Sequence, residues 1–265
     1  MNTVPVADLH VHTTASDGML TIEQLPDAAH QAGVEWVAVT DHDRIHPELS
    51  EPVTRRDGIG IIRGIELRVD AGDQRVDLLG YGVEPTADLV AELDRLQADR
   101  QTRGRRIIEQ VEAQLGVELP IEPRPGIGRP HIARAIDESE APYDYDRAFG
   151  ELIGNDGPCY VPRAVTPVDR GIELLSAACP VVSLAHPFRY PDPEAALDLT
   201  ARVDAVEYAY PYGRDVPIDV LDELCETHDL LRTGGSDAHD ETVGKMGLDS
   251  DDFEQFRRRL QGAVS

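Results

Sequence analysis

The stretch Asp8-Leu9-His10-Val11-His12-Thr13-Thr14-Ala15-Ser16-Asp17-Gly18 decides both the fold and the chemistry that this sequence predicts. Val4 to Leu9 is a short apolar run, which predicts a first β-strand that ends in this motif. Side chains alternate between the faces of a strand, so His10 and His12 are expected on one side as a chelating pair. Asp17 follows a polar turn and can approach the same point. Imidazole and carboxylate groups together suit zinc, manganese or iron.

The next predicted strand also ends in metal-type residues. Thr21 and Gln24 form a capping-box pattern, which opens a helix that stops near Gly33. Val34 to Thr40 is then an apolar run typical of a buried parallel strand, and it leads into Asp41-His42-Asp43. Asp41 and Asp43 are expected to orient imidazoles rather than to bind metal.

Two further strands deliver carboxylates. Ile59 to Ile65 is followed by Glu66, and Arg75 to Tyr81 carries Asp77. Folds with parallel strands place their reactive groups at the C-terminal ends of the strands, and the spacing follows this rule. In isolation, Glu66 is more often a buried carboxylate that pairs with arginine, and a His-X-His pair is more often a chance surface occurrence or a hydrogen-bonded core pair.

The middle of the chain has a helical pattern. Thr86 to Leu115 predicts one long charged helix, and Pro120 to Pro130 is a linker rich in Pro and Gly. A short helix is expected from Pro130 or His131, and another from Tyr143 to Ile153. Residues 86–165 are therefore expected to form a helical insertion.

The alternation of strands and helices resumes after the insertion. The predicted elements are helices at Pro167–Ala178, Pro217–Thr227 and Asp251–Leu260, and strands at Val181–Leu184, Ala205–Tyr208 and Leu230–Thr233. His186 follows the first of these strands, and Asp237 and His239 follow the last with the two-apart spacing of the opening motif. Gly234 and Gly235 allow a close approach of the backbone there.

Composition narrows the class of protein. The chain has 50 acidic and 25 basic residues, a net charge of −25 spread along its whole length, which resembles salt-adapted proteins. No binding of duplex DNA is expected, because the acidic surface repels nucleic acid at low ionic strength. Cys159, Cys179 and Cys225 are widely spaced, which favours a reducing cytoplasm over a disulfide framework. No apolar segment is long enough for a membrane span, and no membrane partner is expected.

The ordered motifs DLHVHTTASDG, TDHD, GIE, RPHIAR, AHP and GGSDAH resemble the PHP superfamily, named for polymerase and histidinol phosphatase. The insertion and RPHIAR are similar to the branch of 3',5'-nucleoside bisphosphate phosphatases and a related RNA 5'-exonuclease. This resemblance implies an α/β fold, a distorted (β/α)7 TIM-like barrel built from residues 1–85 and 166–265. It also implies that residues 86–165 form a cap over the substrate.

The resemblance further implies two or three divalent ions of manganese, zinc or iron. The implied ligands are the imidazoles and carboxylates of the motifs: His10, His12, Glu66 and Asp237 for a first ion; Asp17, His42 and His239 for a second; and Glu66, His186 and Asp77 for a third. Relatives usually carry His at the position of Asp77. The carboxylate is an acceptable ligand there, but it also fits a missing third ion or a solvated acid.

Cations on the insertion supply a candidate phosphate site. Arg100 and Arg103 lie one helical turn apart and share a face of the predicted helix, as do His131 and Arg134 on the next one. The resemblance implies that these residues bind the non-scissile phosphate and the leaving group, with His131 as a contact or proton donor. Ordinary surface ion pairs are the alternative, and we prefer that alternative for residues 105–106.

These observations predict a metal-dependent phosphoesterase that hydrolyses a phosphate monoester or diester of a nucleotide by metal-activated water. The expected substrate is a small phosphorylated molecule, either a 3',5'-nucleoside bisphosphate or the 5' end of a short RNA. No protein nucleophile is required, which agrees with the absence of a GxSxG elbow. Two alternatives stay open: a histidinol-phosphate-type phosphatase, and a catalytically silent PHP scaffold or binding module, which only Asp77 supports.

Overall fold

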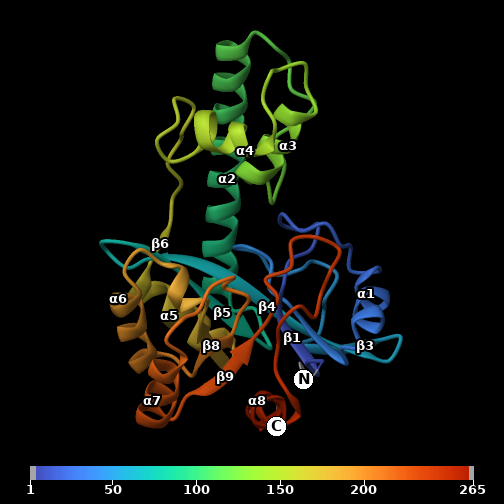
Figure 1. Cartoon of the computed structure of the whole chain (residues 1–265), viewed down its shortest axis with the longest axis vertical. Helices are drawn as coiled ribbons and strands as arrows, with labels where there is room; N and C mark the ends of the chain where they lie inside the picture. Colours follow the sequence, from blue (N-terminus) through green and yellow to red (C-terminus); the bar gives the residue numbers. More distant parts are fainter. Residues whose placement is uncertain (1–3, 263–265) are drawn as a thin grey trace. The chain divides into compact units, whose positions relative to one another are not determined.

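The computed structural model describes residues 4–262 (Figure 1). Contacts within the chain divide these residues into two compact units. Unit 1 comprises residues 4–90 and 165–262, and unit 2 comprises Ala91–Ala164. The predicted insertion, residues 86–165, begins and ends close to these boundaries.

Unit 1 contains one curled sheet. Within residues 4–262 its strands are β1 Ala7–Val11, β2 Trp36–Val39, β3 Val53–Arg56, β4 Ile59–Asp70, β5 Arg75–Tyr81, β6 Thr166–Pro167, β7 Val181–Leu184, β8 Ala205–Ala209 and β9 Leu231–Gly234. The order in the sheet is β1-β2-β4-β5-β7-β8-β9, with β3 and β6 paired to β4. The sequence pattern did not reveal β3 or β6, which are short and lie beside β4.

The direction of β5 distorts the sheet. The pairs β1/β2, β2/β4, β7/β8 and β8/β9 are parallel, whereas β5 runs antiparallel to both of its neighbours, β4 and β7. A hairpin joins β4 to β5 directly, with Arg75 opposite Asp70 and Tyr81 opposite Gly64. The predicted α/β fold with a distorted barrel is confirmed, but β5 departs from the all-parallel pattern.

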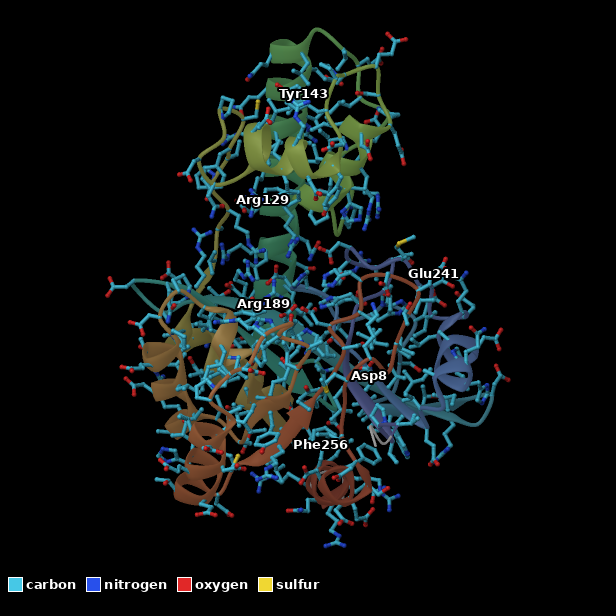
Figure 2. The ribbon with its side chains drawn as sticks, viewed as in Figure 1. Asp8, Arg129, Tyr143, Arg189, Glu241 and Phe256 are labelled. Atoms are coloured by element: carbon cyan, nitrogen blue, oxygen red, sulfur yellow. The ribbon has the colours of Figure 1, made fainter. Side chains whose placement is uncertain are left out.

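The two ends of the sheet order, β1 and the segment after β9, are joined by hydrogen bonds at the opening motif. His12 N donates to Ala238 O over 3.0 Å, and Ala238 N donates to His10 O over 3.3 Å. Asp8, which is labelled in Figure 2, strengthens this junction, because its carboxylate accepts from Ser236 N at 2.9 Å and from Gly244 N at 2.7 Å. The segments around positions 10 and 238 are therefore joined although they are far apart in the sequence.

Helices cover the outside of the sheet (Figure 1). In unit 1 they are α1 Leu25–Ala32, α5 Val168–Ala178, α6 Pro193–Leu197, α7 Ile218–His228 and α8 Ser250–Gly262, with 3-10 turns at Pro187–Arg189 and Asp198–Arg202. The α8 side chains Phe253 and Phe256 pack on the strands, with ring centroids 5.3 Å from Trp36 and 5.1 Å from Tyr81. This packing buries apolar rings of β2 and β5 under the last helix.

Helix α1 begins later than predicted. The capping-box contacts form, with Thr21 N donating to Gln24 Oε1 at 2.9 Å and Gln24 N to Thr21 Oγ1 at 3.4 Å. The helix nevertheless starts at Leu25, because Pro26 is tolerated only in a first turn and would interrupt a helix that began at Thr21. Gly33 ends it in the left-handed region, as expected.

Unit 2 has its own core. Its helices are the main part of α2 Ala87–Leu115, then α3 Arg129–Asp137, α4 Tyr145–Arg147 and a π-helical segment Ala148–Ile153. Apolar side chains of α2, α3 and the π-helical segment form one buried cluster, which includes Ile107, Val111, Ile132, Ile136 and Leu152. Among residues 4–262 we find no helix whose length and apolar character would let it cross a bilayer.

Candidate metal centre

The histidine pair of the opening motif lies where β1 ends. His10 is in β1 and His12 follows it by two residues, and both side chains are fully buried. Their Nε2 atoms lie 3.5 and 3.2 Å from the same oxygen, Oδ1 of Asp237, which follows β9. Alternate residues of a strand share a face, so the pair converges as its spacing predicts.

A second set of side chains surrounds Asp17. Its Oδ1 atom lies 3.4 Å from Nε2 of His239 and 3.8 Å from Nε2 of His42. The His12 ring stacks on the His239 ring, with centroids 4.2 Å apart. His12 therefore faces both Asp237 and the group around Asp17.

Glu66 connects the two sets. Its Oε1 atom lies 3.5 Å from His10 Nε2 and 3.1 Å from His186 Nε2. Its Oε2 atom lies 2.6 Å from His42 Nδ1 and 3.4 Å from His12 Nε2. Both oxygens of this buried carboxylate face imidazoles, which is the arrangement of a bridging ligand. Glu66 lies in the middle of β4, not after the end of a strand as predicted.

The donor set fits divalent metal ions. Among the described residues there are three groups in which each side chain offers a ligand atom within 4.8 Å of those of the other members. The groups are His12, Asp17, His42 and His239; His10, His12 and Asp237; and His10, Glu66 and His186. Nε2 of His10, both ring nitrogens of His12 and Oδ1 of Asp17 are buried and make no hydrogen bond. Such atoms are costly without partners, and ligation by an ion would satisfy them. Every predicted ligand except Asp77 belongs to one of these groups.

Asp77 has a different partner. Arg68, directly opposite on β4, donates from Nε to Asp77 Oδ1 over 2.7 Å and from Nη2 to Oδ2 over 2.5 Å. Asp77 Oδ2 lies 3.9 Å from His186 Nε2, but Asp77 is not in any of the three groups. The hairpin explains this pairing, because it sets Asp77 beside an arginine near the start of β5 rather than at the C-terminal end of a parallel strand.

Burial and the close approach of imidazoles and carboxylates shift the pKa values of the site residues. Burial disfavours the charged form of His239, but the adjacent Asp17 raises the His239 pKa to about 9. Burial likewise opposes ionisation of Asp17, but His42 and His239 hold the Asp17 pKa well below its usual value. Burial, helped by the same two histidines, lowers the pKa of His12. Divalent ions must displace protons from imidazoles such as His239.

Glu207, a fully buried residue of β8, belongs to none of the sequence motifs and was not predicted as part of the site. Its Oε1 atom lies 2.9 Å from His10 Nδ1, and its Oε2 atom accepts a hydrogen bond from His186 N over 2.7 Å. A carboxylate on the far nitrogen of an imidazole fixes the tautomer and orientation of a metal ligand. The one signal in the sequence is an acidic residue inside an otherwise uncharged strand.

The carboxylates of Asp41 and Asp43, which we expected to orient imidazoles, accept hydrogen bonds from the backbone. Asp41 Oδ1 accepts from Thr13 N at 2.8 Å and from Ser16 Oγ at 2.5 Å, which shapes the loop after β1. Asp43 Oδ1 accepts from Arg68 N at 3.2 Å. Both carboxylates therefore hold backbone segments that carry ligands.

Two more unpredicted residues hold Asp237. Arg189, which is labelled in Figure 2, and Tyr210 each donate to Asp237 Oδ2 over 2.8 Å, from Nη1 and Oη respectively. Arg189 Nη1 also donates to Tyr210 Oη. These bonds occupy one carboxylate oxygen and leave the other facing His10 and His12. No spacing pattern in the sequence indicates this contact.

Unit 2 contains a cluster of arginines. Arg100 and Arg103 of α2 are both buried, and Arg103 Nε donates to Val161 O over 2.7 Å. Burial, together with the positive charges of Arg129, Arg163 and Arg100, lowers the pKa of Arg103 to about 9. Guanidinium groups held together in this way favour an anionic partner. Arg129 and Arg163 were not predicted, whereas residues 105–106 are exposed as expected.

His131 and Arg134 lie on α3 of unit 2. His131 Nδ1 accepts a hydrogen bond from Gly128 N over 3.1 Å, so the neutral ring carries its proton on Nε2. A side-chain carbon added at Gly128 would lie 3.6 Å from Arg100 Nη1, which places Arg100 and His131 around the same residue. Arg134 is half-buried one turn further along the helix.

Curated proteins with known activities resemble this chain over most of its length. The 5'-3' exoribonuclease Rnm of Salmonella typhimurium is 28% identical, with 90% of this chain and 86% of that protein covered. The 3',5'-nucleoside bisphosphate phosphatase of Chromobacterium violaceum is 27% identical, with 91% and 89% covered. The phosphoribosyl 1,2-cyclic phosphate 1,2-diphosphodiesterase of Eggerthella lenta is 30% identical, with 91% and 95% covered.

The fold has a close match among solved structures. A candidate metal-dependent phosphoesterase of Bifidobacterium adolescentis superimposes with a TM-score of 0.80 at 24% identity, over 97% of each chain. The family model described as the PHP domain matches residues 8–146, which include the opening motif and Glu66. The chain therefore belongs to the PHP domain family of metal-dependent phosphoesterases.

Proposed function

We propose that this protein hydrolyses a phosphate ester of a nucleotide, either a 3',5'-nucleoside bisphosphate or the 5' end of a short RNA. The observation that carries the proposal is the convergence of imidazoles and carboxylates from β1, β4 and the loops after β2, β7 and β9 around Glu66. The named activities of the relatives, an exoribonuclease and a bisphosphate phosphatase, support the nucleotide class.

The residues fit two divalent ions. His10, His12, Glu66 and Asp237 would hold one ion, and Asp17, His42 and His239 would hold the other. Paired ions in such sites activate a water and neutralise the charge that develops on the oxygens of a phosphoryl transfer. Manganese, iron and zinc all suit this mixture of imidazole and carboxylate ligands.

The protein's own groups then bind and orient the substrate. In this proposal, Glu207 and Asp237 hold their positions through fixed hydrogen bonds, which keeps the ligand geometry rigid. Arg100, Arg103 and Arg134 bind the phosphate that is not cleaved, and His131 donates its Nε2 proton to the leaving oxygen. The buried Arg103 beside other guanidinium groups supports this role, because an anion relieves their mutual repulsion.

Metal analysis and a substrate panel test the proposal. The chain is purified in molar KCl, its metals are measured by mass spectrometry, and phosphate release is assayed with manganese. The panel contains 3',5'-bisphosphates of nucleosides, 5'-phosphorylated short RNA, a ribose cyclic phosphate and histidinol phosphate. We expect release from the first two. Preferred release from histidinol phosphate would replace the substrate class, and a chain without restorable metal or activity would be a silent scaffold.

The arginine assignment makes a separate prediction. Arg103→Ala should raise KM for a bisphosphorylated nucleotide by about tenfold or more, the loss of a charged hydrogen bond, and should leave KM for p-nitrophenyl phosphate nearly unchanged. Arg105→Ala, an exposed arginine of the same helix, is the matched control. Equal changes in KM for both substrates would contradict the assignment, provided that circular dichroism shows a folded variant.

A further inference from the structure

An ion pair on the β4–β5 hairpin lies beside the metal centre. Arg68 and Asp77 face each other across the two antiparallel strands and are joined through both carboxylate oxygens. Asp77 is buried, and its backbone N–H donates to Tyr190 Oη over 2.8 Å, while Tyr190 Oη donates to Ala185 O over 3.0 Å. Arg68 therefore fixes the carboxylate through both oxygens, and Tyr190 holds the backbone of the same residue.

The pair occupies the place where a third ion would bind. Such an ion would take Glu66 and His186, whose facing atoms are 3.1 Å apart, and complete its shell with Asp77. Oδ2 of Asp77 lies 3.9 Å from His186 Nε2, and Arg68 Nη2 binds this same oxygen. An ion at this oxygen would lie next to a guanidinium group, and the like charges would repel.

The alternation of side chains along β4 places Arg68 on the same face of the sheet as Glu66. Glu66 and Arg68 are two residues apart on β4, so their side chains share one face of the sheet. Two of the guanidinium nitrogens, Nε and Nη2, bind Asp77. Nη1 makes no hydrogen bond within residues 4–262, and the side chain is 36% exposed. The planar guanidinium keeps a donor edge available for an oxyanion while its other edge holds the carboxylate.

We propose that Arg68 takes the place of the third metal ion: the chain binds two ions, and the Arg68 guanidinium donates to the phosphoryl group under attack. This inference rests on the proposed phosphoesterase function, and it gives to the Arg68 side chain the positive charge that a third ion would supply. A fixed donor aimed at developing negative charge stabilises the transition state more than the bound substrate.

Metal stoichiometry is the first test. We expect the wild-type protein, loaded with manganese and freed of excess metal, to retain two ions per chain by mass spectrometry. The double variant Arg68→Ala/Asp77→His should retain a third. Three ions in the wild type would overturn the inference while leaving the phosphoesterase function intact. No retained ion would instead contradict the proposed function.

Chemical rescue tests the contact with phosphate. Arg68→Ala should lower kcat about a hundredfold or more, by analogy with the loss of one oxyanion donor. Added guanidinium ion at millimolar concentration should restore part of the rate, which a merely structural arginine would not allow. Arg75→Ala, at the exposed start of β5, is the matched control and should keep the wild-type rate. Unchanged kcat in Arg68→Ala, or a lowered kcat that guanidinium does not restore, would refute the contact.

Discussion

At the scale of single residues, the candidate centre depends on carboxylates that hold imidazoles in place. Glu207 is buried and contacts both His10 and the backbone N–H of His186. Asp237 is held through one oxygen by Arg189 and Tyr210 and turns the other toward His10 and His12. Glu207, Arg189 and Tyr210 thus hold the candidate ligands in place, although none of the three belongs to the clusters of ligand atoms. Asp237 does belong to one of these clusters.

Glu207→Gln should weaken metal binding. The neutral amide no longer stabilises His10 in the orientation and tautomer that an ion needs, and the loss of such a partner typically costs about 10–100-fold in affinity. Manganese affinity measured by isothermal titration calorimetry checks this expectation. Glu223→Gln, an exposed acid on α7, is the control and should leave the affinity unchanged. An unaltered affinity in Glu207→Gln would show that Glu207 has no positioning role.

Metal binding should release protons in a defined range of pH. Without metal, the pKa of His239 is raised to about 9, so its imidazole is protonated at pH 7.5 and must lose a proton to coordinate an ion. The apparent affinity should therefore rise with pH until about pH 9 and then stop depending on this group. Calorimetry at pH 7.5 in buffers of different ionisation enthalpy measures the release. Identical heats in all buffers would contradict a protonated His239.

At the scale of secondary-structure elements, the join between β1 and the loop after β9 brings the two halves of the centre together. Gly235 lies at this join, and a side-chain carbon there would come within 2.3 Å of His10 N and 2.4 Å of His10 Cβ. Backbone atoms cannot move aside as a flexible side chain can. The glycine is therefore required by close packing of two strand ends, not by an unusual backbone angle.

Gly235→Ala should destabilise the fold. Overpacking at this contact is expected to lower the free energy of unfolding by about 1–3 kcal/mol or more. Urea denaturation followed by circular dichroism measures the change. Gly262→Ala near the end of α8, where an added carbon meets nothing within 4 Å, should change the stability by less than about 0.5 kcal/mol. Equal stabilities of the two variants would argue against a tight join.

At the scale of the whole molecule, the net charge of −25 determines how the chain responds to salt. Carboxylates distributed over the sequence repel one another in the compact state at low ionic strength. The screening length falls from ~10 Å at 0.1 M salt to ~3 Å at 1 M, so most of this repulsion disappears in molar salt. The same screening reduces the repulsion of an anionic substrate.

The melting temperature should therefore rise with potassium chloride. We expect a clear increase in Tm between 0.1 and 1 M KCl in thermal unfolding followed by circular dichroism, with a smaller increase from 1 to 2 M. Sucrose at equal osmolality provides the control, because it is excluded from the surface without screening charge. A Tm that is flat or falls with KCl would contradict a salt-adapted surface.

Local sequence by itself determined much of this protein. The motifs from Asp8 to Gly18 and from Gly234 to His239 carry their ligands at strand ends, and residue spacing places those ligands on a common face. The limits of β5 and β7 were also predictable, because each is a short, largely apolar run bounded by breaks in the pattern. These features depend on neighbours in the chain, which is why they can be read from it.

Only the tertiary structure decided the pairings between distant segments. Which strands become neighbours when the sheet curls decides three features: the antiparallel direction of β5, the Arg68–Asp77 ion pair and the contact of Glu207 with His10. A buried acid has no local pattern that names its partner, because its free energy depends on groups up to 197 positions away. The sequence therefore predicted most residues of the candidate metal centre, whereas the fold determined what orients them and what binds Asp77.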